Sequence, residues 1–131
     1  MRDRSASVAR PANRLRAGHA GGVPDYSPEQ PVRDDIDATS GPLVLAFGTE
    51  WCGFCLAADR YISPALADQA KVPVIGVEDG PGRPLGRSYR VKLWPTLVFL
   101  RDGVELDRVV RPGNRAVIDE ALAKITTTPR P

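Results

Sequence analysis

The chain has 131 residues, 42% of them hydrophobic and 26% charged, with a formal net charge of +2, which predicts one soluble globular domain and excludes a large multidomain enzyme. Even the best apolar run, residues 43–47, is far shorter than the roughly 18 residues of a membrane-spanning helix, so we expect no membrane partner. The only cysteines, Cys52 and Cys55, exclude a secreted scaffold with several bridges, and with a single histidine they exclude a four-ligand zinc site.

Residues 1–24 are rich in Arg, Ala, Gly and Ser and contain no Ile, Phe, Trp or Tyr. Such a segment buries too little apolar surface to offset the entropy of ordering, so we expect a disordered tail there. The folded domain is expected over 25–126 and a flexible C-terminus over 127–131. The tail lacks the apolar segment of a secretion signal, which makes the cytoplasm the expected compartment, although its Arg-rich composition also resembles an organelle transit peptide.

The first half of the domain alternates between predicted helix and strand. Two prolines favour a short helix over 28–38, which ends at a Ser-Gly-Pro turn. Residues 43–47 are continuously apolar and bounded by turn residues, which is typical of a central strand covered on both faces. A helix is expected over 52–62, and Ser63-Pro64 predicts that it kinks or restarts there and continues to about residue 70.

The second half continues the alternation and ends in a hairpin and a helix. We predict a buried strand over 72–77 and, after a Gly/Pro-rich loop, a short helix over 84–89. Strands over 96–100 and 104–110 flank Asp102-Gly103, a dipeptide favoured in type I′ hairpin turns. Asn114 caps a last helix with apolar residues at i, i+3, i+4 and i+7, namely Ile118, Ala121, Leu122 and Ile125.

This order, α-β-α-β-α-β-β-α, combines a β-α-β unit with a β-β-α unit. A β-α-β unit forms a right-handed parallel pair, whereas a hairpin adds antiparallel strands. The predicted fold class is therefore α/β, a three-layer α/β/α arrangement around a central mixed sheet.

The motif Cys52-Gly53-Phe54-Cys55 lies where the buried strand ends and a helix begins. Free N–H groups and the helix dipole stabilise a thiolate at this point, so Cys52 is the candidate nucleophile. Cys55 lies about one turn further on the same face and is the candidate to attack a mixed disulfide at Cys52. A structural bridge over so short a loop would stabilise little, which leaves two small buried cysteines as the alternative.

The segment from Phe47 to Cys55 (FGTEWCGFC) and the later Trp94-Pro95-Thr96 resemble the thioredoxin family, over about residues 28–125. The resemblance implies a thioredoxin fold in which Pro95 is a cis proline that faces the cysteine pair. It also implies that the backbone of Trp94 pairs with an extended substrate segment. An ordinary trans proline at the start of an edge strand is the alternative.

The chain departs from the family at the buried acid. Family reductants usually carry an Asp five residues before Trp51, which takes the proton from the second cysteine, and Ala46 stands there instead. The companion lysine is also missing from 72–77. Deprotonation of Cys55 then relies on water or on a nearby acid, and we expect slower resolution of the mixed disulfide. The nearby acids are Glu50, Glu78 and Asp79.

Other departures concern the substrate groove. Gly53-Phe54 lacks the histidine of the family's strong oxidants, which argues against a strongly oxidising protein. Trp51, Phe54 and Trp94 would form an aromatic rim for apolar, extended protein segments, or they pack locally. Arg111 stands where the family generally has a glycine. Its positive charge would favour the Cys52 thiolate or an acidic substrate; the alternative is that the side chain simply points to solvent.

These features together predict a monomeric thiol–disulfide oxidoreductase that reduces or exchanges protein disulfides. Cys52 attacks and Cys55 resolves, and no metal or organic cofactor is implied because the electrons reside on the redox-active Cys52–Cys55 disulfide. The family resemblance implies a thioredoxin-reductase-like enzyme or a small thiol as electron donor. The alternative is a non-catalytic binding or chaperone module that uses the aromatic groove. We expect no nucleic-acid partner, because the one basic stretch is typical of a solvated helix face; it contains Arg83, Arg87, Arg90 and Lys92.

Overall fold

A computed structural model of the chain describes residues 25–127, so the expected tail over 1–24 and the residues from 128 onward lie outside the described part. Within it the eight elements follow in the order expected from the sequence. They are α2 (Arg33–Asp37), β2 (Pro42–Gly48), α3 (Gly53–Ala67), β3 (Val74–Glu78), α4 (Pro84–Ser88), β4 (Thr96–Arg101), β5 (Val104–Val110) and α5 (Ala116–Thr126).

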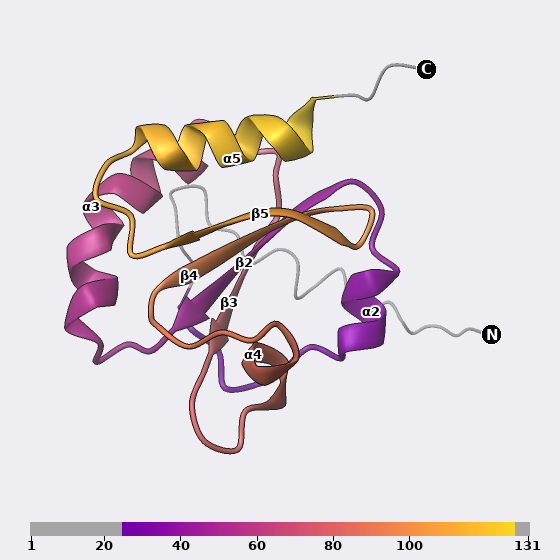
Figure 1. The fold of residues 1–131 in the computed structure, drawn as a ribbon, viewed down its shortest axis with the longest axis vertical. Helices are drawn as coiled ribbons and strands as arrows, with labels where there is room; N and C mark the ends of the chain where they lie inside the picture. The colour runs from indigo at the N-terminus through magenta and orange to yellow at the C-terminus, as the bar shows by residue number, and fades with distance from the viewer. Residues whose placement is uncertain (1–24, 128–131) are drawn as a thin grey trace.

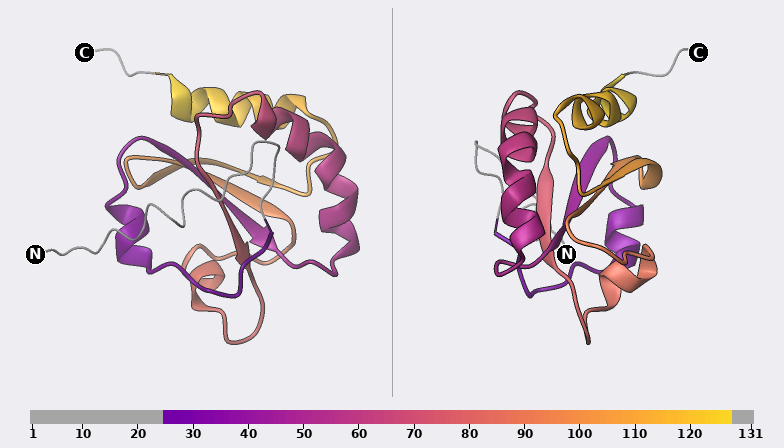
Figure 2. Two further views of the ribbon diagram at one scale, coloured as in Figure 1. Left: turned by 180° about the vertical axis from the view of Figure 1, so that it is seen from behind. Right: turned by 60° about the vertical axis from the view of Figure 1, so that its left-hand side comes forward.

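The four strands form one mixed sheet in the order β3-β2-β4-β5. β2 pairs with β3 in parallel and with β4 antiparallel, and β4 pairs with β5 antiparallel. Figures 1 and 2 show α3 and α5 on one face of this sheet and α2 and α4 on the other. The predicted three-layer arrangement with a mixed sheet is confirmed.

The central strand β2 is buried on both faces, which explains its continuous apolar sequence. Because side chains alternate along a strand, Val44 and Ala46 join the core beneath α3 and α5. Leu43, Leu45 and Phe47 join the second core beneath α2 and α4. Both cores therefore hold β2 in place, and its carboxyl end delivers the chain to the start of α3.

Turn and cap chemistry follows the sequence closely at two places. Asp102 and Gly103 have φ values of +52° and +80°, the left-handed conformation that a type I′ hairpin turn requires. The Asn114 side chain accepts a hydrogen bond from the Val117 N–H at 3.1 Å, so it caps the start of α5 as expected.

Of the two alternatives predicted at Pro64, a kink or a restart of the helix, the restart is wrong, and Figures 1 and 2 show that the ribbon of α3 bends along its length. The helix runs through this proline without restarting, and the Ser63 hydroxyl donates to the Asp59 carboxylate at 2.6 Å instead of capping a new helix. The proline removes its own N–H from the helical ladder and its ring crowds the carbonyl four residues earlier, and the packing of α3 on the sheet outweighs this cost. Within residues 25–127, none of the helices has the length and apolarity needed to span a membrane.

Candidate active site

Cys52 stands at the junction between the carboxyl end of β2 and the first turn of α3. Its backbone is extended, and its Sγ accepts a hydrogen bond from the N–H of Cys55 at 3.2 Å. The sulfur thus takes the position of an N-cap acceptor, at the positive end of the helix dipole. Both cysteines are free thiols and each is only 5% exposed. Cys52 is thus the cysteine that receives the backbone hydrogen bond at the start of α3.

Cys55 has a different environment. Burial, and to a smaller extent the interaction with Cys52, raises the pKa of its thiol to about 11. The nearby Thr49 backbone and Tyr26 side chain lower this pKa by a smaller amount. Cys55 is therefore protonated at neutral pH, and it must lose a proton before it can attack a disulfide.

The acids near the site have separate roles. Ala46 is fully buried in the core, and as an alanine it supplies no carboxylate there. The Asp79 carboxylate accepts a hydrogen bond from the Trp94 indole N–H at 2.8 Å, and Glu78 forms an ion pair with Arg83 at 3.1 Å. Of the three acids considered from the sequence, only Glu50 lines a pocket together with Cys55.

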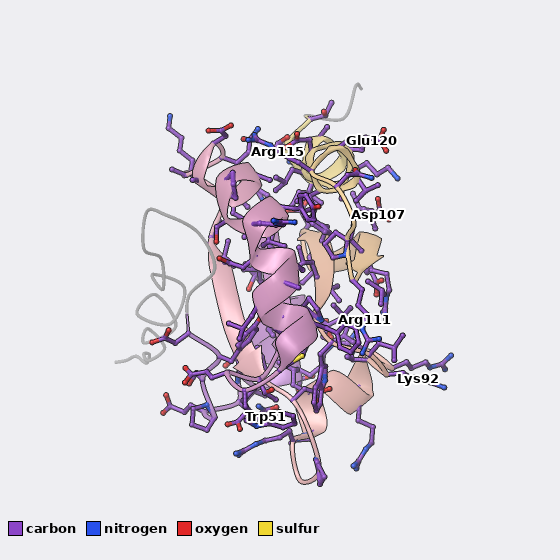
Figure 3. All side chains as sticks on the ribbon, turned by 90° about the vertical axis from the view of Figure 1, so that its left-hand side faces the viewer. Trp51, Lys92, Asp107, Arg111, Arg115 and Glu120 are labelled. Atoms are coloured by element: carbon purple, nitrogen blue, oxygen red, sulfur yellow. The ribbon has the colours of Figure 1, made fainter. Side chains whose placement is uncertain are left out.

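The aromatic side chains gather around the cysteine loop. Trp51 meets Trp94 edge to face with ring centroids 5.7 Å apart, and the Trp94–Pro95 peptide bond is cis, in agreement with the expectation. Trp51 is 74% exposed and Phe54 57% exposed, which is unusual for large aromatic side chains. Figure 3 shows Trp51 below the first turn of α3 and Arg111 to one side of it.

Arg111 connects the two halves of this rim. Its N–H donates to the Pro95 carbonyl at 3.0 Å, and its Nε donates to the Trp94 carbonyl at 2.8 Å. Its guanidinium lies 3.7 Å from the centroid of the Phe54 ring. The alternative that Arg111 only points to solvent is therefore wrong. The guanidinium thus donates a hydrogen bond to the Trp94 carbonyl, which is part of the backbone that we expected to pair with the substrate.

Gly53 lies between the two cysteines, and the basic stretch lies beside Trp94. A methyl group on Gly53 would meet nothing within 4 Å, so the glycine leaves open space between the cysteines. The basic side chains do not form only a solvated helix face: with Trp94 they line an open pocket of about 580 Å³. The four cations in that lining are Arg83, Arg87, Arg90 and Lys92.

Sequence reasoning missed Tyr26, which lies beside the second cysteine. The only sequence signal for such a contact was Gly48, a glycine four residues before Cys52. A Cβ built on Gly48 would lie 2.7 Å from the Cys55 Sγ and 2.8 Å from Cζ of Tyr26. The absence of a side chain there is what lets the tyrosine reach the sulfur. Within residues 25–127 no group of three or more His, Cys, Asp or Glu residues is arranged to hold a metal ion.

Comparison with known proteins yields consistent matches. The family model described as Thioredoxin matches residues 28–124. Thioredoxin H-type 1 of Nicotiana tabacum is 39% identical over 72 residues, so the match spans 52% of this chain and about half, 54%, of that relative. Protein disulfide-isomerase A2 of Pongo abelii is 34% identical over 107 residues, which cover 66% of this chain and 20% of that protein. The structure of thioredoxin 2 from Pseudomonas aeruginosa PAO1 in its reduced form superposes with a TM-score of 0.69 at 52% identity, covering 77% of this chain and 94% of that chain.

Proposed function

The chain belongs to the thioredoxin family, and from this premise we propose that it reduces or exchanges disulfides of protein substrates through Cys52 and Cys55. The observation that carries the proposal is the hydrogen bond from the Cys55 N–H to the Cys52 sulfur at the start of α3. This geometry favours a thiolate on the first cysteine and keeps the second within reach of it.

The reaction proceeds in two exchanges of sulfur bonds. The Cys52 thiolate attacks one sulfur of the substrate disulfide, which breaks that bond and releases the other sulfur as a thiolate that takes a proton. Cys55 then loses its proton and attacks the Cys52 sulfur, and the bond between Cys52 and the substrate breaks. Two electrons and two protons pass to the substrate, and a Cys52–Cys55 disulfide remains. A thioredoxin-reductase-like enzyme or a small thiol returns it to the dithiol.

The substrate segment binds along the aromatic rim. The exposed rings of Trp51 and Phe54 supply apolar contact area, and Trp94 is held by its bond to Asp79. The segment runs past Pro95 and pairs with the backbone of Trp94, where it meets or displaces Arg111. Such a groove suits an extended, partly unfolded segment around a disulfide, with Gly53 leaving room for its backbone.

The test is reduction of a disulfide-bonded protein, with dithiothreitol as the electron donor, by wild type, Cys52→Ser and Cys55→Ser. Both substitutions should abolish turnover, because each removes one of the two sulfurs that carry electrons. Ala57→Ser is the matched control, since it places a hydroxyl on the exposed side of α3 and should leave the rate unchanged.

Unchanged turnover in either cysteine variant would contradict the proposal. If wild type showed no turnover, and both cysteine variants suppressed aggregation of an unfolded protein as well as wild type, the binding or chaperone alternative would take its place. The residue that favours this alternative is Ala46, because it leaves the second step without the family's buried acid.

A further inference from the structure

Tyr26 is fixed beside the active site by the segment that contains it. The neighbouring Ser27 pairs with the outer edge of β3: its N–H donates to the Gly76 carbonyl at 3.1 Å, and its carbonyl accepts from the Glu78 N–H at 2.9 Å. This pairing places the Tyr26 ring against the carboxyl end of β2. The ring is partly buried and packs against the core beneath α3.

The Tyr26 ring and the Cys55 sulfur meet at Gly48. A Cβ on that glycine would lie within 3 Å of both groups, so no side chain separates them. The part of the ring that approaches Gly48 includes Cζ, the carbon that carries the hydroxyl. The end of the ring that carries the hydroxyl therefore lies near the resolving sulfur.

An open pocket of about 300 Å³ leads from this contact to the surface. Tyr26 and Cys55 line it together with Thr49, whose buried hydroxyl has no hydrogen-bond partner among the described residues. A polar pocket of this size holds water, and an unpartnered buried hydroxyl is the kind of group that ordered water satisfies. The carboxylates of Glu50 and Asp59 also lie along the pocket.

Building on the function proposed above, we propose that Tyr26 and the pocket beside it promote deprotonation of Cys55, a step for which this chain lacks the family's buried acid at Ala46. The Tyr26 hydroxyl donates a hydrogen bond to the Cys55 sulfur as the thiolate forms, and the pocket beside it carries the proton to solvent. The proton leaves the Cys55 sulfur for pocket water, and the electron pair stays on that sulfur and forms the bond to Cys52. The bond between Cys52 and the substrate then breaks, and its electron pair leaves with the substrate sulfur.

The charges around the pair agree with this role. Burial raises the pKa of Tyr26 well above its usual range, so the hydroxyl stays protonated and acts as a donor, not as the base. The same hydrogen bond lowers the pKa of Cys55 against the larger effect of burial. The other titratable groups that face the pair are Cys52, Asp59, Glu50 and Asp25.

The test is Tyr26→Phe, which removes the hydroxyl and keeps the ring. A hydrogen bond to a charged acceptor is lost, so we expect the pKa of Cys55 to rise by about one unit and release of the mixed disulfide at pH 7 to slow about tenfold. The pKa is measured by thiolate absorbance in the Cys52→Ser background, and release by stopped-flow fluorescence. Tyr61→Phe is the matched control, because Tyr61 belongs to the core packing of α3 and does not line the pocket.

A second variant perturbs the contact between Tyr26 and Cys55 without changing either residue. Gly48→Ala places a methyl group where the ring and the sulfur meet, so it should shift the pKa of Cys55 and the release rate in the same direction as Tyr26→Phe. If Tyr26→Phe and Tyr61→Phe gave the same pKa of Cys55 and the same release rate, the role of Tyr26 would be refuted while turnover by wild type would still support the proposed function. If wild type itself showed no turnover, the proposed function would fail first.

The basic pocket beside Trp94 carries a second, independent inference. Arg83 is paired with Glu78, whereas Arg87, Arg90 and Lys92 form no ion pair with any residue in 25–127. All three of these cations are exposed and line the same pocket as the Trp94 side chain. We infer that this pocket binds acidic side chains of the protein substrate that lie next to the disulfide.

Two peptide disulfides that differ only in Glu or Gln residues beside the cysteine test this inference. The double variant Arg87→Glu and Arg90→Glu should lower kcat/KM for the Glu peptide about tenfold and that for the Gln peptide less than about twofold. Lys71→Glu is the control, since it makes the same kind of charge change at an exposed position outside the pocket. Equal losses on both peptides would overturn the inference, as would tighter binding of a single-stranded oligonucleotide than of the Glu peptide.

Discussion

Arg111 combines an unfavourable backbone with favourable side-chain contacts, and two substitutions separate these effects. Its φ of +47° lies in the left-handed region, which costs a residue other than glycine roughly 1–2 kcal/mol. Against this, the hydrogen bond from its Nε to the Trp94 carbonyl contributes about 1 kcal/mol. Its guanidinium over the exposed Phe54 ring contributes about 0.5–1 kcal/mol.

Arg111→Ala loses both contacts and keeps the backbone cost, so the free energy of unfolding should fall by about 1.5–2 kcal/mol. Arg111→Gly loses the same contacts but removes the backbone cost, so it should be about 1 kcal/mol more stable than Arg111→Ala. Both variants free the Trp94 carbonyl equally. Any change in KM for a peptide disulfide should therefore be the same in the two variants, although their stabilities differ.

Urea unfolding of the reduced proteins, followed by tryptophan fluorescence, measures these differences directly. Equal stability of the alanine and glycine variants would refute the argument from the backbone. An alanine variant as stable as wild type would refute the argument that the two side-chain contacts hold the rim together.

Three further predictions concern the cysteine pair and the groove. Ala46→Asp should speed release of the mixed disulfide in stopped-flow experiments and lower the free energy of unfolding by about 1–3 kcal/mol, because the carboxyl is buried; unchanged release would contradict this. Asp79→Ala should raise KM for a peptide disulfide several-fold, since Trp94 loses its charge-assisted hydrogen bond, and an unaltered KM would show that this bond does not position the indole. The pKa of Cys55 is raised from 9.0 to about 11, so its contribution to stability is complete below pH 9 and is lost as the pH rises through 11; urea unfolding of reduced wild type should show this loss beginning near pH 9, whereas Cys55→Ser should show only the loss due to the raised pKa of Tyr26, which begins above about pH 10.

The fold was largely predictable because its signals are local. The apolar run of β2 contains no polar residue, so neither face of the strand that it forms is suited to solvent. This pattern predicts a strand that is covered on both faces. Asp102-Gly103 fixes the hairpin through two residues in the left-handed region. The apolar periodicity of α5 likewise matches its buried face, Ile118, Ala121, Leu122 and Ile125.

The parts of the site that escaped prediction depend on contacts between distant segments. Tyr26 reaches Cys55 only because Ser27 pairs with the edge of β3, and a single such bridge leaves no periodic pattern in the sequence. The position of Arg111 was foreseen, but its partners were not, because they depend on where the Phe54 ring and the Trp94 carbonyl lie in space. Local sequence thus placed the cysteines, and tertiary contacts decided what surrounds them.

The central claim is that Cys52 attacks the substrate and Cys55 resolves the mixed disulfide. Intact-mass measurement of each cysteine variant, incubated with a disulfide-bonded protein, tests it most directly. Cys55→Ser should accumulate a one-to-one covalent complex through Cys52 that dithiothreitol dissociates, and Cys52→Ser should form none. The absence of a complex with Cys55→Ser, or an equal amount with Cys52→Ser, would contradict the assignment.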